Sequence, residues 1–200
     1  MLTISETQTQ TLELPPAGAH AARCSRIIDL GTQKSTFEGE VRSQRKVLIS
    51  WELAEQRSDG TPFMISRRFG LSLNEKAALR QFLVAWRGRQ FSDDELQAFD
   101  LRRLAGAPCL LNLVAVERAG KEYRNVVAVS PLPRGMVAPG LVADPIVFEI
   151  EGERAEAILG QLSESLQATI TASHEWQARK APPPVPPGAI LADLDDDIPF

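Results

Sequence analysis

One stretch of the sequence decides the fold: Lys46-Val47-Leu48-Ile49-Ser50-Trp51-Glu52-Leu53. Its alternate positions carry apolar side chains, at Val47, Ile49, Trp51 and Leu53. The positions between them include three polar side chains, at Lys46, Ser50 and Glu52. Side chains of a strand point alternately to opposite faces, so this period of two predicts a strand with one buried face. We take residues 41–53 as the clearest strand of the chain.

Four other segments predict strands. An apolar pattern over residues 20–30 ends at the turn residues Gly31-Thr32, and another alternation follows a turn cluster at residues 58–62. Two apolar runs flank Arg118-Ala119-Gly120-Lys121-Glu122 and predict a hairpin. In chain order, the five expected strands are residues 20–30, 41–53, 63–71, 108–117 and 123–131.

A helix is expected between the third and fourth strands. Ser72 followed by Glu75 fits a capping box, in which a hydroxyl and a carboxylate satisfy main-chain amides at a helix start. The helix then runs to about Trp86, with an apolar stripe at helical spacing that we expect to pack on a sheet. A second capping box, Ser92 with Glu95, predicts a short helical piece after it.

The last third of the chain predicts a helix and a tail. Residues 153–170 place apolar side chains on one side of an amphipathic helix, which could pack on the body or mediate homo-oligomers. Residues 181–188, Ala-Pro-Pro-Pro-Val-Pro-Pro-Gly, favour extended polyproline geometry. We expect a disordered, Pro-rich and acidic tail that holds the final residues away from the body.

The order of these elements predicts a mainly β fold with helices, in the α+β class. Three strands, a helix and two strands make the order of an OB-fold, a five-stranded barrel whose second and third strands form a nucleic-acid platform. Other five-stranded α+β folds give the same order and stay open as alternatives. The expected organisation is a flexible segment 1–17, an OB-like domain 18–135, an extension 136–178 and a tail 179–200.

Charge is divided unevenly along the chain. A length of 200 residues with 44% hydrophobic content suits one globular domain with appended segments, and the net charge is -4. Residues 20–135 hold 19 Lys and Arg against 13 Asp and Glu, a net charge of +6. The flanks hold 3 basic and 13 acidic residues, a net charge of -10. A basic body therefore carries acidic extensions.

The compartment follows from hydropathy and cysteine usage. The sequence has no apolar run of the roughly 18 residues that a membrane span needs, and residues 1–10 are polar rather than a basic-then-apolar export signal. Cys24 and Cys109 lie among apolar residues, which favours buried thiols over a disulfide or a metal site. We expect a cytoplasmic protein that binds no membrane.

The C-terminal tip is the most specific motif. Four aspartates (Asp193, Asp195, Asp196 and Asp197) precede the apolar Ile198-Pro199-Phe200. Such a peptide suits an apolar pocket with a basic rim, where Phe200 inserts its ring and the aspartates steer the approach. Residues 195–200 resemble the acidic tip of bacterial single-stranded DNA-binding proteins. The resemblance implies recruitment of replication, recombination and repair proteins through Asp195, Asp196, Asp197, Ile198, Pro199 and Phe200.

A second resemblance covers residues 20–135. Three blocks carry it: Ile28-Asp29-Leu30-Gly31-Thr32-Gln33, Ser72-Leu73-Asn74-Glu75-Lys76 and Ala85-Trp86-Arg87-Gly88. They are similar to blocks in a group of phage and prophage proteins described as single-stranded DNA-binding proteins. This resemblance implies a phage or prophage origin and a bacterial host cytoplasm. The body lacks the N-terminal sequence of the bacterial housekeeping proteins, so DNA contacts are not carried over from them.

A sequence-tolerant site for single-stranded DNA needs cations along the phosphates and aromatic rings for the bases. In an OB arrangement the following candidates would converge: Lys34, Phe37, Arg45, Lys46, Arg67, Arg68, Phe69, Lys121, Tyr123 and Arg124. Arg87 and Arg89 at the helix end are further candidates for phosphate contacts, whereas Trp86 continues the apolar stripe. For Trp51 and for Phe69, core packing and base stacking are both open, with core packing favoured for Trp51.

An enzyme is the less favoured class. The sequence has no phosphate-binding G-x-x-x-x-G-K-[ST], no H-E-x-x-H and no G-x-S-x-G, and we expect no catalytic residues, no cofactor and no bound metal. The leading hypothesis is a non-enzymatic, sequence-tolerant binder that protects single-stranded DNA and recruits partners. Two alternatives remain: an adaptor that competes for host tail-binding pockets without binding DNA, and a nuclease using Asp29, Glu38, Glu40 and Glu52 around a metal.

Overall fold

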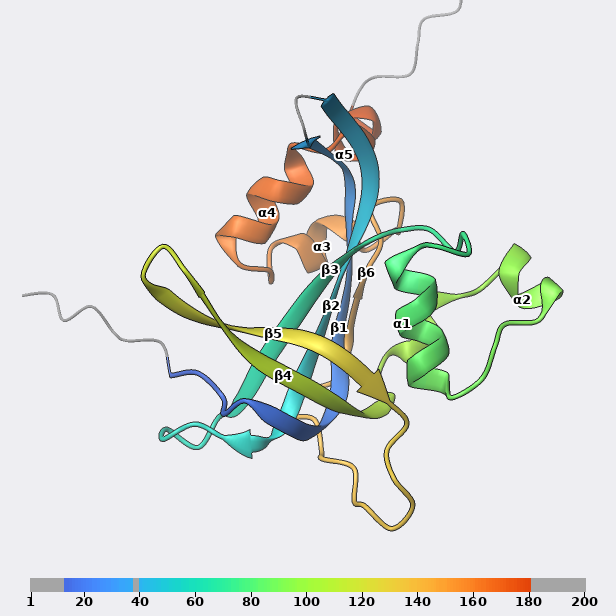
Figure 1. Cartoon of the computed structure of the whole chain (residues 1–200). Helices are drawn as coiled ribbons and strands as arrows, with labels where there is room; N and C mark the ends of the chain where they lie inside the picture. Colours follow the sequence, from blue (N-terminus) through green and yellow to red (C-terminus); the bar gives the residue numbers. More distant parts are fainter. Residues whose placement is uncertain (1–12, 38–39, 181–200) are drawn as a thin grey trace, which may run out of the picture.

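The computed structural model describes residues 13–37 and 40–180 (Figure 1). Its strands are β1 (Gly18–Phe37), β2 (Glu40–Gln56), β3 (Pro62–Gly70), β4 (Pro108–Arg118), β5 (Lys121–Ser130) and β6 (Ile146–Phe148). Its helices are α1 (Ala78–Arg87), α2 (Asp93–Gln97), the 3-10 turn η1 (Leu101–Leu104), α3 (Ala155–Leu159), α4 (Glu164–Thr171) and α5 (His174–Lys180). The expected mainly β architecture with helices is confirmed at this level.

The sheet is mostly antiparallel, with the order β3-β2-β1-β4-β5. One edge of β1 pairs with β2 along most of its length. Its other edge pairs first with β4, over Gly18–Arg23, and then with the short parallel strand β6, over Arg26–Ile28. All five expected strands are present, and β6 is a sixth that the sequence pattern did not predict. Three residues give too short a pattern for a period to be read.

β1 is longer than expected because it continues through the predicted turn at Gly31-Thr32. Two register shifts against β2, one between Cys24 and Arg26 and one between Asp29 and Gly31, each insert an extra residue. Such bulges bend a strand and increase its twist. Gly31 lies at the second shift with a φ of 66°, a backbone region that favours glycine. A Cβ there would come within 2.5 Å of Ser173, so Gly31 also permits close packing of the C-terminal part.

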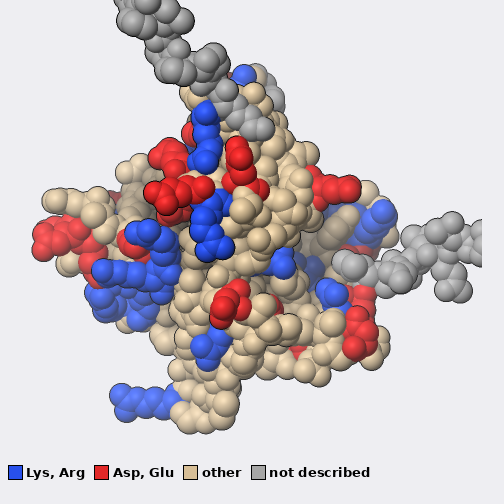
Figure 2. Space-filling model, turned by 180° about the vertical axis from the view of Figure 1, so that it is seen from behind, with Lys and Arg blue, Asp and Glu red and all other residues tan. Residues whose placement is uncertain are grey.

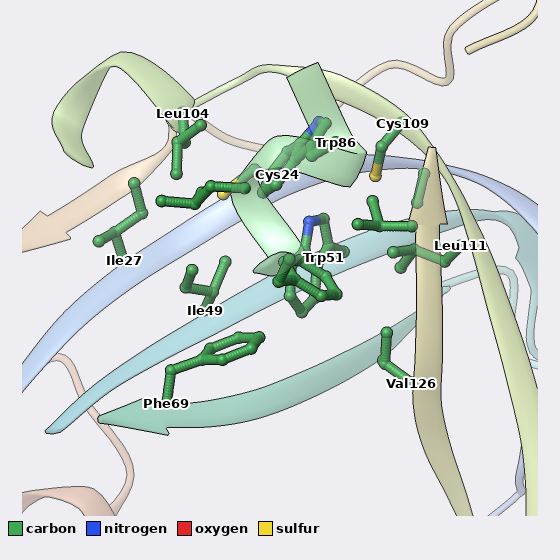
Figure 3. Close-up of a cluster of buried hydrophobic side chains, with 14 of the residues drawn as sticks. Cys24, Ile27, Ile49, Trp51, Phe69, Trp86, Leu104, Cys109, Leu111 and Val126 are labelled. Carbon is green, nitrogen blue, oxygen red and sulfur yellow. The ribbon is translucent and has the colours of Figure 1, made fainter. Parts of the chain in front are cut away.

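The main core lies between the inner side of the sheet and α1 (Figure 3). Trp51 is fully buried, and its ring lies 5.6 Å from that of Phe82 and 5.7 Å from that of Trp86. Phe69 is 3% exposed and packs against Phe82 at 4.9 Å. Trp51, Phe69 and Trp86 therefore pack in the core, and their burial favours the core-packing alternative for Trp51 and Phe69 over base stacking.

Helix α1 begins later than the sequence indicated. Its N-cap is Ala77, which provides no side-chain hydrogen bond. The hydroxyl of Ser72 instead accepts a 3.2 Å hydrogen bond from the amide of Asn74, so the expected capping box at Ser72 is wrong. A serine that bonds an amide two residues on stabilises a turn in place of a helix start. The second capping box, Ser92 with Glu95, is confirmed at the start of α2.

The C-terminal part folds back onto the body. Instead of one amphipathic helix over residues 153–170, this part forms three short helices, and α3 ends at Leu159 with Gly160 as its C-cap. A second core joins Ile28, Leu30 and Leu48 of β1 and β2 to Phe148 and Trp176. These strand residues lie on the outer side of the sheet, opposite the main core. Figure 1 shows α4 and α5 near the C-terminal end of β1 and the N-terminal end of β2.

Cys24 and Cys109 are free and buried, as expected. Burial raises the pKa of the Cys24 thiol to about 12, so this thiol stays protonated near neutral pH. Within residues 13–37 and 40–180, none of the helices is long and apolar enough to cross a bilayer.

Candidate nucleic-acid interface

The outer side of β1, β2 and β3 brings three cations onto neighbouring strands. Leu48 of β2 lies opposite Arg68 of β3, and Lys46 lies opposite Gly70 two positions along. Ser50 lies opposite Arg26 on one side and Ser66 on the other. Because residues two apart in a strand share a face, these residues share the outer side of the sheet with the buried Leu48. We call Arg26, Lys46 and Arg68 the outer cations.

Within residues 13–37 and 40–180, the outer cations have no counter-ion. Arg68 is exposed, and Arg26 and Lys46 are half-buried. None of these three side chains forms a hydrogen bond or ion pair with another residue in the described part of the chain, whereas the hydroxyls of Ser50 and Ser66 bond each other at 2.8 Å. Diagonal neighbours such as Lys46 and Arg68 are typically about 7–8 Å apart across a sheet. This arrangement suits a chain of negative charges laid across the strands.

Arg26 was not among the DNA contacts expected from the sequence. The register shift between Cys24 and Arg26 inserts Ser25 into β1 and reverses the faces of the residues that follow, up to the second shift between Asp29 and Gly31. A period-two pattern cannot show such a shift, and no sequence signal marked it. Lys46 and Arg68 were expected, and the structure brings both to this face.

Part of the outer side is covered. The second core buries Ile28, Leu30 and Leu48 under the C-terminal helices. Glu175 of α5 accepts hydrogen bonds from the amide of Thr32, at 2.7 Å, and from its hydroxyl, at 2.5 Å. The open strip is therefore the part along β3, where Arg68 and Ser66 are exposed.

The β1–β2 hairpin carries two further candidates. Lys34 is exposed and lies opposite Ser43. Phe37 ends β1 and lies opposite Glu40, but its side chain falls outside the described part of the structure. Both residues belong to the hairpin end beyond the second core.

The β4–β5 hairpin presents an aromatic ring. Tyr123 is 45% exposed. Among the described residues, it is the one aromatic residue whose side chain is exposed. Lys121 is also exposed, at the start of β5. Arg124 points to the other side, where its Nε donates to the carbonyl of Pro15 and its Nη1 donates to Glu122, each at 2.7 Å. Tyr123 and Lys121 are thus presented to solvent, whereas Arg124 is held by the protein.

Arg67 points toward the inner side of β3. Its guanidinium lies 4.8 Å from the ring centre of Phe69 and 5.3 Å from that of Phe82. Its Nη1 donates to the carbonyl of Val126 in β5 at 3.0 Å. Burial lowers the pKa of Arg67 from its ordinary value. Arg67 and Phe69 therefore contribute to packing between β3, β5 and α1.

Three other predicted cations are already paired with carboxylates. Arg45 bonds Asp29 at 2.6 Å, and this bond raises the pKa of Arg45. Arg87 and Arg89 share Glu95 as a counter-ion, with Arg89 at 2.7 Å. The Arg87 guanidinium also lies 4.4 Å from the ring centre of Phe91. A DNA phosphate would have to compete with these internal partners.

Glu95 is the common partner of this helix-end cluster. Hydrogen bonds from Arg89, from the amide of Ser92 and from Arg87 lower the pKa of Glu95 to about 2. The face in Figure 2 shows basic side chains gathered on one side with acidic side chains close beside them. Net charge alone therefore overstates how much of the basic body faces solvent without a counter-ion.

The carboxylates considered for a nuclease have other contacts. Asp29 is bonded to Arg45, and Glu52 accepts a 3.0 Å hydrogen bond from the amide of Val142. Glu40 pairs with Arg42 at 3.1 Å, and Glu38 falls outside the described residues. Among the described residues, no group of three or more His, Cys, Asp and Glu side chains is placed to hold a metal ion.

The C-terminal tip, residues 195–200, also lies outside the described part of the chain. Comparison with known proteins adds no relative: no family model matches the chain, and no curated protein matches it.

Proposed function

We propose that the chain is a non-enzymatic, sequence-tolerant single-stranded DNA-binding protein that protects DNA and recruits other proteins through its C-terminal tip. The outer cations carry this proposal. A cation whose charge is not matched inside the protein attracts phosphates, and neutralising a phosphate releases condensed counterions. Among the described residues, Arg26, Lys46 and Arg68 provide three charges without a counter-ion on adjacent strands, with the hydroxyl of Ser66 beside them.

The strand arrangement supports a five-stranded OB-fold-like barrel as the scaffold. β1 is shared between β2 and β4, β5 continues from β4, and α1 lies between β3 and β4 in the chain. Arg67 links β3 to β5, the two ends of this order. In OB-folds the second and third strands and the neighbouring loops bind oligonucleotides. We propose that DNA follows the open strip of β3 toward Tyr123, where a base stacks on the exposed ring.

Recruitment rests on the sequence of the tip. The acidic run and the terminal Ile198-Pro199-Phe200 suit a basic-rimmed apolar pocket on replication, recombination or repair proteins. The two sequence resemblances support a phage or prophage protein that acts in the cytoplasm of a bacterial host, without a cofactor.

Titration of labelled oligo-dT at two salt concentrations tests DNA binding. We expect saturable binding whose logarithmic salt slope is about -0.7 for each neutralised phosphate. Absence of binding at low salt would reject this function and leave the adaptor alternative. Shortening of the labelled strand with Mg²⁺ present would favour the nuclease alternative instead.

Deletion of Phe200 tests the tip separately. We expect partner proteins to be lost from a pull-down, while oligo-dT affinity stays unchanged or rises slightly because an acidic tail competes with DNA. Retention of the same partners by the shortened chain would contradict the docking role.

A further inference from the structure

A cleft of about 580 Å³ lies apart from the outer cations. Its walls come from β1 and β2, from residues 71–73 before α1, from residues 96–102 and from residues 147–152. Volumes of this size are typical of sites that bind small molecules. The cleft is therefore large enough to hold one or two apolar side chains.

The floor of the cleft is apolar. It is formed by Ile27, Val47, Leu79, Leu96, Phe99 and Leu101. Ile27, Val47 and Leu79 belong to the main core, and the other three are partly buried residues packed against it. An apolar ligand would extend the core and remove this floor from water, which is favourable in proportion to the area covered.

The rim of the cleft is charged and carries more acid than base. Arg45 is held by Asp29 at 2.6 Å and reaches Glu151 at 3.6 Å. Arg102 is held by Asp100 at 2.9 Å and reaches Glu149 at 3.9 Å. Two guanidinium groups thus face four carboxylates, which leaves a net charge of -2 at the rim.

Glu149 and Glu151 are the two rim carboxylates that can turn to a bound cation. Their side chains are 54% and 76% exposed, and their ion pairs are longer than those of Asp29 and Asp100. Long, exposed ion pairs are weak, so an incoming cation can replace them at small cost. Asp100 and Asp29 would keep the arginines in place while Glu149 and Glu151 turn to a ligand.

The net charge of the rim selects the occupant. A DNA phosphate and the acidic tip of this chain would both be repelled by an excess of carboxylates. A peptide that carries Lys or Arg beside a large apolar side chain matches both the rim and the floor. We propose that this cleft binds a short basic and apolar peptide segment of a partner protein, at a site separate from the outer cations.

A direct binding measurement on the full chain tests this site. The probe is a fluorescein-labelled peptide, Gly-Lys-Arg-Leu-Phe-Lys-Gly, followed by anisotropy. We expect saturable binding that weakens about tenfold or more, the equivalent of about 1.4 kcal/mol, when Leu-Phe is replaced by Ser-Ser or when the basic residues are replaced by Glu. Equal binding of the three peptides, or no binding of the first, would overturn the proposal.

Two double variants locate the site. Glu149→Lys with Glu151→Lys should weaken the probe about tenfold or more. Glu153→Lys with Glu156→Lys makes the same change in net charge at exposed positions that do not line the cleft, and should change affinity less than twofold. Equal weakening by both pairs would show nonspecific attraction and overturn the assignment. Amide shifts on probe binding should cluster at residues 96–102 and 147–152, and shifts confined elsewhere would also overturn it.

Discussion

The guanidinium of Arg67 in β3 donates a 3.0 Å hydrogen bond to the main-chain carbonyl of Val126 in β5. These strands stand at opposite ends of the order β3-β2-β1-β4-β5 and are not paired with each other. One side chain therefore connects the two ends of the sheet, and its position over Phe69 and Phe82 ties this connection to the core. Arg68, the next residue, points to solvent.

This contrast predicts opposite effects of two matched substitutions. Arg67→Met should lower the free energy of unfolding by about 1–3 kcal/mol, because it removes a charged hydrogen bond to a main-chain carbonyl. Arg68→Met should change stability by less than about 0.5 kcal/mol, as is usual at an exposed site, but should weaken oligo-dT binding. Urea unfolding and DNA titration of both variants check this, and equal stability losses would contradict the structural role of Arg67.

The outer cations predict the salt dependence of DNA binding. Replacing Arg26, Lys46 and Arg68 by Gln should reduce the magnitude of the logarithmic salt slope by about 2, since each lost phosphate contact removes about 0.7. A control with Lys76, Arg103 and Arg134 replaced by Gln changes net charge equally at exposed positions. If the control lowers the slope as much, DNA is not bound at the outer cations.

Tyr123 predicts a stacking contribution that depends on the ring. Tyr123→Ala should weaken oligo-dT binding by about 1–3 kcal/mol, the range for one stacked base, whereas Tyr123→Phe should keep most of the affinity. Anisotropy titrations at one salt concentration compare the two variants. A similar loss in both would indicate that the hydroxyl, rather than the ring face, makes the contact.

Glu95 predicts a pH dependence of stability. Its pKa is lowered from 4.5 to about 2 by bonds from Arg89, Ser92 and Arg87, so folding favours the charged form. A lowered folded-state pKa gives stability that is complete above the unfolded-state value and is lost as the pH falls toward the folded-state value. The stability difference between the native chain and Glu95→Gln should therefore shrink as the pH falls from about 5 to about 2. Urea midpoints across this range measure it, and a constant difference would contradict the assigned bonds.

Gly31 predicts a specific coupling between β1 and the C-terminal helices. Gly31→Ala forces an Ala into a positive φ and also places its Cβ 2.5 Å from Ser173. Gly60→Ala shares the positive φ, but its Cβ would meet nothing within 4 Å. Gly31→Ala should cost about 1–3 kcal/mol more than Gly60→Ala because of overpacking. Urea unfolding compares them, and faster proteolysis after residue 150 in Gly31→Ala would locate the effect.

The sequence determined five of the strands that the structure describes, and the inner side of β2. The alternation of Val47, Ile49, Trp51 and Leu53 is a local property, and all four residues are buried in the main core. The apolar stripe of α1 placed Trp86 in the same core. Periodicity was less informative at element ends, where Asn74 bonding to Ser72 replaced the expected helix start.

Tertiary structure alone decided which cations lack a partner within the described residues. The inserted Ser25 turned Arg26 to the outer side, the C-terminal helices covered Leu48, and Glu95 became the counter-ion of Arg87 and Arg89. A strand period is set by neighbouring residues and can be read along the chain. Bulges, coverage and ion pairing depend on segments brought together in space, so a sequence that predicted the sheet could not by itself distinguish its free charges from its paired ones.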